Sequence, residues 1–369
     1  ATTISHEFTH LGINYNLEKP SLSSSTTIET RLKMDRSTTY ALMGAGLHGV
    51  NRVNPITSLH MYDTYVVPRV IFGLEYMIVS LPCMKRLETA HRTLLRNIQT
   101  LPKRTAIPAL HILLGTLPIQ ATIEKRQVMS ILSLANNNAI LDIIIHQVAC
   151  KNSDSNSWVI STQRLLHKYR LPGLLEVINL NPRKKQWKKV VEDAVRKYWK
   201  KQIEEQAVAK STLQHLNKEY TGSPHPIWKL TSSDPRDVRR ANTKVRMITG
   251  TYILQSTRAA FNQTRNTRCP MCQAGDEDMT HFLIECSALE DYRRPLLSQI
   301  ISAIPLVYHS HPSQWPPPIL TQLVLDPTHP TIQSLIPLQS CVHEIIERVS
   351  KLLCYRLHVR RCIFMGQNP

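Results

Sequence analysis

Apolar residues along most of the chain recur at the three- and four-residue spacing of amphipathic helices. Leu87, Leu94, Leu95 and Ile98 follow this spacing, and the stretch from Val342 to Leu357 repeats it. Prolines interrupt the first half of the chain often enough to divide it into helices of ordinary length. We therefore expect a mainly α-helical fold, ending in a helix over residues 338–363.

The N-terminal residues depart from this helical pattern. The run from Phe8 to Ile13 is typical of a strand, and a turn region rich in Ser and Thr follows it. Thr26 and Thr27 suit the N-cap of a helix that continues through Met34. We expect a short β segment ahead of the first helical bundle.

Residues 183–219 predict one long basic helix. An apolar stripe runs along it, formed by Trp187, Val191, Ala194 and Tyr198. Lys and Arg occupy much of the remainder, and the segment 221–226, with its Gly and two Pro, ends the pattern. Helical character returns from Val238 to Phe261.

The charge of the chain is concentrated in this region. The 369 residues include 45 Lys and Arg against 27 Asp and Glu, a formal net charge of +18. Residues 183–262 carry +11 of it, whereas residues 263–369 are neutral. Such a surplus favours nucleic acid as a partner over an acidic membrane surface. The expected phosphate contacts are Lys184, Lys185, Lys188, Lys189, Arg196, Lys197, Lys200, Lys201, Arg239, Arg240, Lys244 and Arg246. Alternatively, the basic helix is only a solvated face over a core that contains Trp187 and Tyr198.

The most specific motif has the spacing C-x2-C-x8-H-x4-C and consists of Cys269, Cys272, His281 and Cys286. Three thiolates and an imidazole suit tetrahedral Zn2+, and four protein ligands leave no open position, as in structural sites. His281 and Cys286 are five residues apart, about 140° around an ideal helix. Their helix must therefore start late or distort for both to reach one ion. The alternative is three buried cysteines and a surface histidine.

Several enzyme signatures are absent from the sequence. It contains no GxxxxGK[ST], no GxSxG and no Asp-Asp pair of the kind that holds two catalytic Mg2+ ions. Asp326 and Glu344 would be the candidates for a nuclease pair, but Asp326 lies in Leu325-Asp326-Pro327 and is typical of an ordinary turn residue. No apolar window long enough to span a membrane and no signal-peptide pattern is evident. We expect no membrane partner and an intracellular location, nuclear or cytoplasmic, with reduced cysteines.

Several short pieces occur together in the order found in one protein family. They are Phe8–Ile13, Leu47–Pro55, Tyr65–Arg69, Gly73–Glu75, Leu113–Ile119, Thr249–Phe261, Cys269–Cys272 and His281–Cys286. In their order and spacing, the chain resembles the C-terminal part of a non-LTR (LINE-type) retrotransposon reverse transcriptase over most of its length.

The resemblance implies five consecutive segments. They are a palm-end remnant (1–25) with a primer-grip-like turn at Leu11 and Gly12, a thumb-like helical bundle (26–150), a basic helical connector (151–237), a CCHC zinc-binding module (238–295) and a C-terminal helical tail (296–369). In that family the catalytic Asp residues precede the primer grip, so this chain would start after them. Mg2+ would then bind only in a full-length polymerase, while the chain holds structural Zn2+.

We therefore expect a nucleic-acid-binding fragment of an RNA-directed DNA polymerase, inactive alone. Its implied partners are RNA or DNA and the missing N-terminal polymerase region. An active polymerase encoded by a fuller gene is one alternative. A host-domesticated, zinc-containing protein-interaction module is another, and it would expose an apolar seam of Val342, Ile345, Val349 and Leu353. Core packing of that seam is the expected outcome.

Overall fold

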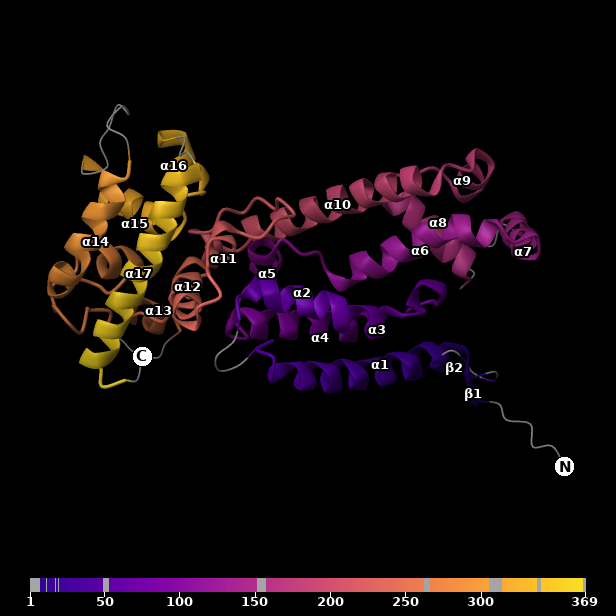
Figure 1. The fold of residues 1–369 in the computed structure, drawn as a ribbon, viewed down its shortest axis with the longest axis horizontal. Coiled ribbons are helices and arrows are strands. Elements are labelled where there is room, and N and C mark those ends of the chain that lie inside the picture. The colour runs from indigo at the N-terminus through magenta and orange to yellow at the C-terminus, as the bar shows by residue number, and fades with distance from the viewer. Residues whose placement is uncertain are drawn as a thin grey trace. The chain divides into compact units, whose positions relative to one another are not determined.

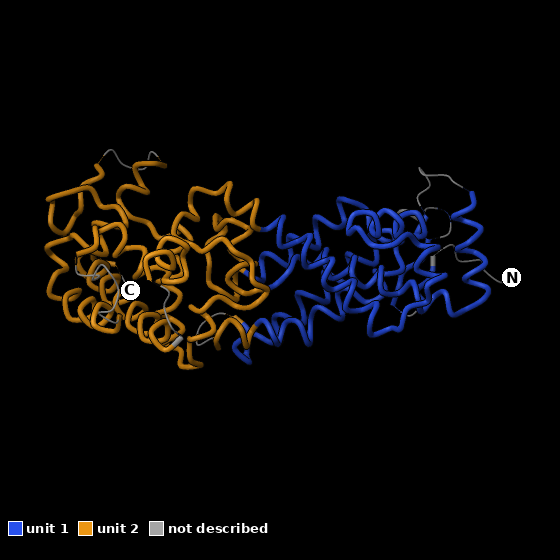
Figure 2. The backbone as a smooth tube through the Cα atoms, turned by 90° about the horizontal axis from the view of Figure 1, so that it is seen from above, with its two compact units in different colours: residues 1–47, 59–95, 116–203 blue, residues 48–58, 96–115, 204–369 orange. Residues whose placement is uncertain are grey.

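The computed structural model describes residues 7–10, 12–16, 18, 20–48, 53–150, 157–261, 266–304, 314–336 and 340–367. Helices account for most of these residues, and a two-stranded sheet lies near the N-terminus (Figure 1), so the predicted mainly α fold is confirmed. The chain divides into two compact units, each assembled from segments that are not consecutive in sequence (Figure 2). No single helix in the described segments has both the length and the apolarity to cross a membrane.

Unit 1 comprises residues 1–47, 59–95 and 116–203. Its own elements are β1 (Glu7–His10), β2 (Ile13–Asn16), α1 (Pro20–Met43), α3 (Val67–Ile71), η1 (Leu74–Tyr76), α6 (Ile119–Ala135), α7 (Asn138–Ala149), α8 (Trp158–Lys168) and α9 (Leu174–Leu180). One hydrophobic core joins α6, α8 and α9 to the basic helix, and it includes the buried side chains of Val128, Leu166, Val177 and Trp187.

Unit 2 comprises residues 48–58, 96–115 and 204–369. Its own elements are α5 (Ile107–Leu114), η2 (Ser211–Leu213), α11 (Pro226–Lys229), α12 (Pro235–Ile248), α13 (Gln255–Ala260), η3 (His281–Glu285), η4 (Ser287–Leu289), α14 (Glu290–Ser302), α15 (Pro317–Leu325), α16 (Pro330–Leu335) and α17 (Ser340–Phe364). Helices α2 (Pro55–Tyr65), α4 (Leu81–Gln99) and α10 (Lys184–Val208) contribute residues to both units.

The predicted N-terminal strand is a hairpin. β1 and β2 pair antiparallel with Phe8 opposite Tyr15, and the two rings stack with centroids 5.1 Å apart. Gly12 lies in the turn with φ of +72°, a conformation that residues with a Cβ rarely adopt. Arg31 donates a hydrogen bond to the Gly12 carbonyl at 2.9 Å, which ties the turn to α1. Leu11 lies outside the described residues.

The first helix begins earlier than the Thr pair predicted. α1 starts at Pro20, a residue suited to a first helical turn because its missing N–H has no partner there. Thr27 is fully buried within the helix, and its hydroxyl accepts a hydrogen bond from the Asn14 N–H at 3.0 Å. The Thr27 hydroxyl therefore joins β2 to α1 and is not an N-cap.

The predicted basic helix is α10, which ends at Val208 and not near residue 219. Its stripe packs as expected, since Trp187 and Val191 are buried and the Trp187 indole N–H donates to the Val128 carbonyl at 3.3 Å. Beyond α10, the buried Leu213 and Leu216 keep a helix-like spacing, but they belong to a short 3₁₀ turn and the segment after it. The apolar spacing therefore predicted a longer helix than the one observed.

The predicted C-terminal helix is confirmed as α17. Val342, Ile346 and Leu353 are buried in unit 2, where α17 packs against α12 and α14. Ile345 is 46% exposed. Of the four predicted seam residues, Val342 and Leu353 are buried, Val349 is half-buried and Ile345 lies at the surface, so core packing holds for part of the seam and the seam is not a continuous exposed surface.

Candidate metal centre and basic surfaces

The four residues of the Cys/His motif converge. Their ligand atoms all lie within 4.8 Å of one another, and this is the one such group found among the described residues. The Cys269 and Cys286 sulfurs are 3.7 Å apart, and the Cys272 sulfur lies 3.2 Å from His281 Nε2. Cys269 and Cys286 are fully buried, while Cys272 is partly accessible. This cluster can hold a metal ion.

The sulfur positions also exclude a disulfide. A disulfide needs sulfurs about 2.05 Å apart. A tetrahedral ion with metal–sulfur bonds of about 2.3 Å needs sulfurs about 3.8 Å apart. The observed 3.7 Å between Cys269 and Cys286 matches the second geometry. The donor set and the sulfur spacing therefore fit a four-coordinate metal.

A tight turn presents the first two ligands. The Gln273 N–H donates to the Cys269 carbonyl at 3.0 Å, and Gln273 itself has a φ of +58°. The Cys269 N–H donates to the Gly275 carbonyl at 2.8 Å, and Arg268 and Asp276 form an antiparallel bridge. The short hairpin folds the chain back so that both thiols face the same point.

A π-helical turn presents the other two. η3 spans His281–Glu285, and the Cys286 N–H donates to the His281 carbonyl at 2.7 Å, the i to i+5 pattern of a π-turn. This widening brings residues five apart onto the same side, where an α-helix would separate them. The distortion expected from the spacing is therefore confirmed, and it has a specific form.

The acidic residues of the loop have structural partners. Asp278 accepts a hydrogen bond from the His281 N–H at 2.7 Å, which positions the start of η3. Glu277 is fully buried and receives two hydrogen bonds from Arg361 of α17, at 2.6 and 2.8 Å. Glu277 also accepts from the Gln255 N–H at 2.9 Å. The bidentate ion pair anchors the ligand loop to α17, and the hydrogen bond from Gln255 joins it to α13.

The three thiols differ in their acidity. Burial, assisted by the Cys269 thiol, raises the pKa of Cys286 to about 12. Burial also raises the pKa of Cys269. At Cys272 burial acts in the same direction, but hydrogen bonds from the Ala274 N–H and the neighbouring ligand side chains outweigh it and lower the pKa to about 7. A bound cation would favour ionisation of all three, because thiolates are the ligand form.

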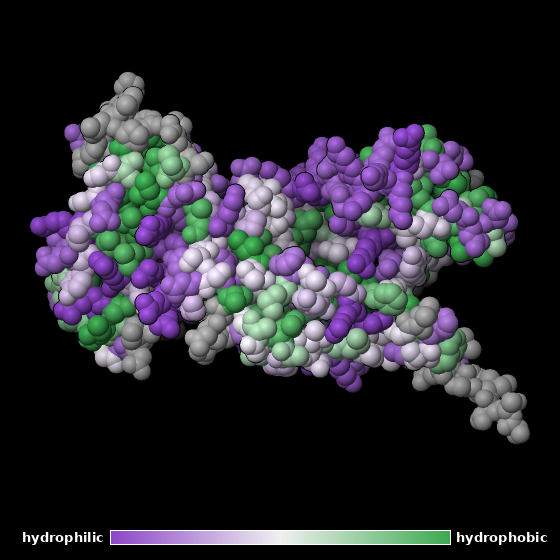
Figure 3. Space-filling model, viewed as in Figure 1, coloured by the Kyte–Doolittle hydropathy of each residue, from purple (hydrophilic) through white to green (hydrophobic). Residues whose placement is uncertain are grey.

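The basic residues of α10 lie largely at the surface. Lys184, Lys185, Lys188, Lys189, Arg196, Lys197 and Lys201 are exposed, and Lys200 is half-buried. Figure 3 shows hydrophilic residues gathered over α10. One acidic residue of the helix, Glu192, is engaged by Lys125 of α6 at 3.5 Å.

The predicted cluster on α12 is only partly a surface. Arg239 and Arg246 are exposed and Arg240 is half-buried. Lys244 is fully buried, and its ammonium group donates to both Glu347 oxygens at 2.8 Å and to the Ser350 hydroxyl at 2.7 Å. Lys244 therefore cannot contact phosphate, and that prediction was wrong. The apolar spacing of Ala241, Val245 and Ile248 places Lys244 on the buried face, a signal that charge counting ignored.

Asp326 also has a role that the sequence reading missed. It is fully buried and accepts hydrogen bonds from the Asn217 N–H at 2.7 Å and from Thr328, and it pairs with His225 at 3.3 Å. These partners overcome the effect of burial and lower the pKa of Asp326. Asp326 thus secures the chain after α10 to the end of α15.

Lys168 occupies a box of aromatic rings. Its ammonium group lies 5.2, 4.9 and 5.1 Å from the ring centroids of Tyr169, Tyr198 and Trp199. It also donates to both oxygens of Glu124, at 2.9 and 2.7 Å. Because its charge is satisfied within unit 1, Lys168 serves to hold α10 against α6 and α8.

Two short sequence matches to known site motifs occur in unsuitable local structure. Residues 44–49 match GxGxxG, but Gly44 and Gly46 follow helix α1, whereas the dinucleotide motif follows a strand. Residues 6–10 match HExxH, but Glu7–His10 form strand β1, whereas that zinc motif needs a helix. Gly49 and His6 lie outside the described residues. Neither match supports a site.

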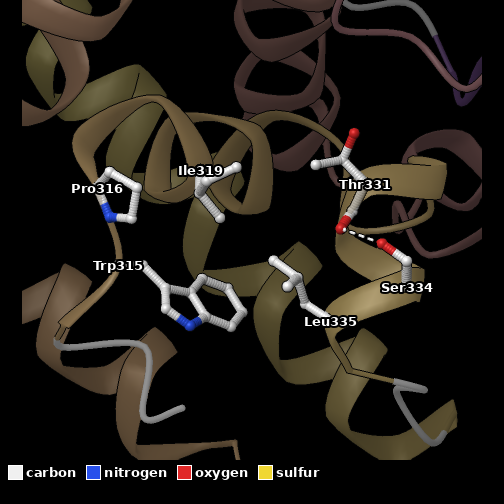
Figure 4. A pocket seen from close by; sticks show the side chains of 6 residues that line it. All are labelled: Trp315, Pro316, Ile319, Thr331, Ser334 and Leu335. Carbon is white, nitrogen blue, oxygen red and sulfur yellow. Dashed lines mark hydrogen bonds between the residues drawn. The ribbon is translucent and has the colours of Figure 1, made fainter.

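A pocket lies between α15 and α16 (Figure 4). It is lined by Trp315, Pro316, Ile319, Thr331, Ser334 and Leu335. The Ser334 hydroxyl donates to the Thr331 carbonyl at 3.0 Å. Apart from two hydroxyl groups and the Trp315 indole N–H the lining side chains are apolar, and none is titratable or a metal ligand. The pocket therefore offers no catalytic chemistry.

Comparison with known proteins found no matching family model, curated protein or solved structure. The metal cluster and the basic surfaces are therefore the features that bear on function.

Proposed function

We propose that this chain binds RNA or DNA as the C-terminal part of a non-LTR retrotransposon reverse transcriptase, without catalytic activity of its own. The observation that carries the proposal is the exposed row of cations on α10. The buried stripe of the same helix fixes which way that row faces. The cations therefore form a surface of defined orientation, which the net charge alone would not establish.

The row follows from helical geometry. At about 100° per residue, Lys185, Lys189 and Arg196 fall in one narrow sector, opposite the buried Trp187 and Val191. At a rise of about 1.5 Å per residue, the three cations extend along roughly 16 Å of the helix. A line of cations at this scale can neutralise successive phosphates and release their counterions.

The metal cluster would hold Zn2+ in a structural role. Three sulfurs and one nitrogen favour Zn2+ over the hard cations that bind oxygen. The ion would cross-link the Cys269–Cys272 turn to η3, and the four protein ligands would leave no position for a reacting water. Mg2+ is proposed only for a fuller polymerase that carries the family's catalytic Asp residues.

Metal analysis tests the zinc assignment. We expect one equivalent of zinc in the purified protein, measured by elemental mass spectrometry after dialysis against metal-free buffer. Cobalt substitution should then give the absorption of a tetrahedral site with thiolate ligands. Protein that folds fully and carries no stoichiometric metal would contradict the assignment.

A matched pair of variants tests the nucleic-acid surface. The first variant carries Lys185→Gln, Lys189→Gln and Arg196→Gln. The control removes the same charge from exposed cations of the neutral C-terminal region, through Arg294→Gln, Arg348→Gln and Arg356→Gln. Each phosphate contact contributes about 0.7–0.9 to the slope of log affinity against log salt. The α10 variant should lower that slope by about 2.1–2.7, and the control should leave it unchanged. Equal effects of the two variants would refute a specific role for α10.

The two alternatives have less support. The protein-interaction module needed an exposed seam on α17, and Val342 and Leu353 are buried there. An active polymerase concerns a longer gene product. Reading the gene upstream of Ala1 for an intact [FY]-x-Asp-Asp would decide it.

A further inference from the structure

Two arginines are tied to one turn beside the metal centre. Arg104, between α4 and α5, donates a hydrogen bond to the Thr251 carbonyl at 2.5 Å. The N–H groups of Thr251 and Tyr252 in turn donate to the Arg246 carbonyl, at 2.8 and 2.9 Å. All four residues belong to unit 2. The turn therefore holds Arg104 and Arg246 near each other although 142 residues separate them in sequence.

Among the described residues, no carboxylate forms an ion pair with either arginine, and both arginine side chains are exposed. Burial of part of the guanidinium, together with the charge of Arg104, lowers the pKa of Arg246. The contrast is Arg361, whose charge is compensated by the buried Glu277. Two like charges held in proximity without a counter-ion favour binding of an anion.

The pair lies close to the metal cluster through one aromatic contact. Tyr252 stacks on Phe282 with centroids 5.6 Å apart and planes inclined by 26°. Phe282 directly follows the ligand His281 within η3. The Tyr252 hydroxyl also hydrogen-bonds His358 Nδ1 at 2.9 Å. The turn that carries the arginines is therefore packed against the metal module by buried side chains.

We infer that Arg104 and Arg246 form a phosphate-binding site, which contacts the nucleic-acid backbone beside the metal module. The inference rests on the proposed function and adds a second contact surface, in unit 2, to that of α10. Guanidinium groups suit it because their planar fork matches phosphate oxygens in pairs. A backbone contact positions the nucleic acid and carries no base preference.

The test uses the full chain with its metal and a 20-nucleotide single strand of mixed sequence, as RNA and as DNA. Affinity is measured over a series of salt concentrations. Arg104→Gln with Arg246→Gln should lower the salt slope by about 1.4–1.8, and Arg294→Gln with Arg348→Gln should not. The loss of affinity should be similar for oligonucleotides of different sequence. Arg246→Gln alone guards against a folding effect, because its guanidinium has no hydrogen bond within the described residues, and it should lower the slope by about 0.7–0.9.

A wild-type slope in both arginine variants would overturn this inference. If the α10 variant still lost its slope in the same experiment, the proposed function would stand without the arginine site. If the wild-type chain showed no salt-dependent binding at all, both would fail.

Discussion

The buried pair of Lys244 and Glu347 gives the sharpest test of how α12 and α17 are joined. The two side chains are 0% and 1% exposed, and the ammonium group donates to both carboxylate oxygens at 2.8 Å. Lys244→Met would leave the Glu347 carboxylate buried without its counter-ion. Removing one partner of a buried pair costs about 3–5 kcal/mol. We expect a loss of this size in the free energy of opening α12 and α17.

Amide hydrogen exchange measures this loss locally. Opening that is easier by about 3 kcal/mol should speed exchange in α12 and α17 by more than 100-fold. The amides of α8, in unit 1, serve as the internal reference. The double variant Lys244→Met with Glu347→Leu removes both charges and should recover most of the protection, since well-packed apolar residues often replace a buried pair without loss.

The same variants separate the structural role from the predicted phosphate contact. The double variant should bind nucleic acid with the wild-type salt slope, because Lys244 does not reach the surface. The reasoning would be refuted if Lys244→Met left exchange in α12 and α17 unchanged and instead weakened nucleic-acid binding.

Three further changes have defined outcomes. Cys269→Ser or Cys286→Ser should release the metal and speed amide exchange over residues 266–295 while α8 keeps its protection; retained metal would contradict the ligand set. Burial, opposed by a backbone hydrogen bond with Leu117, lowers the pKa of His91 to about 4, below its unfolded value of about 6.5. The unfolded chain therefore binds more protons in this window, so stability should fall as pH falls from about 6.5 to 4. His91→Gln should flatten that dependence in urea titrations at successive pH values, and an unchanged pH profile would argue against it. Lys168→Met should destabilise unit 1 by about 2–3 kcal/mol, which is less than the cost for a fully buried pair because the Lys168 side chain is 23% exposed. Amide exchange in α6 and α8 measures this loss. A change below about 0.5 kcal/mol would show that the contacts of Lys168 do not stabilise unit 1.

Features that depend on local spacing were predictable from the sequence. The Cys/His motif identified its four members and even the need for a distorted helix, because ligand spacing and helical angle are properties of neighbouring residues. The same holds for α17 and for the apolar stripe of α10. The motif could not reveal the bidentate pair of Glu277 and Arg361, because a contact across 84 residues leaves no local pattern.

Features that depend on distant partners were not predictable. Lys244 was predicted to be a surface cation because the prediction considered its charge and not its position on the buried face of α12. Thr27 was read as a cap because Asn14, which donates to its hydroxyl, lies in a different element. Asp326 was read as an ordinary turn residue, whereas its buried role depends on His225 and Asn217, 101 and 109 residues away. In each case the decisive contact is with a residue of another element, and no local sequence pattern indicates it.

The central claim is that this chain binds nucleic acid by phosphate neutralisation. The most direct measurement is the affinity of the metal-loaded wild-type chain for RNA and DNA as salt is raised. The account predicts a linear fall of log affinity with log salt and a slope of at least about 3, from four or more phosphate contacts. Affinity that does not change with salt, or no binding to either nucleic acid at low salt, would contradict it.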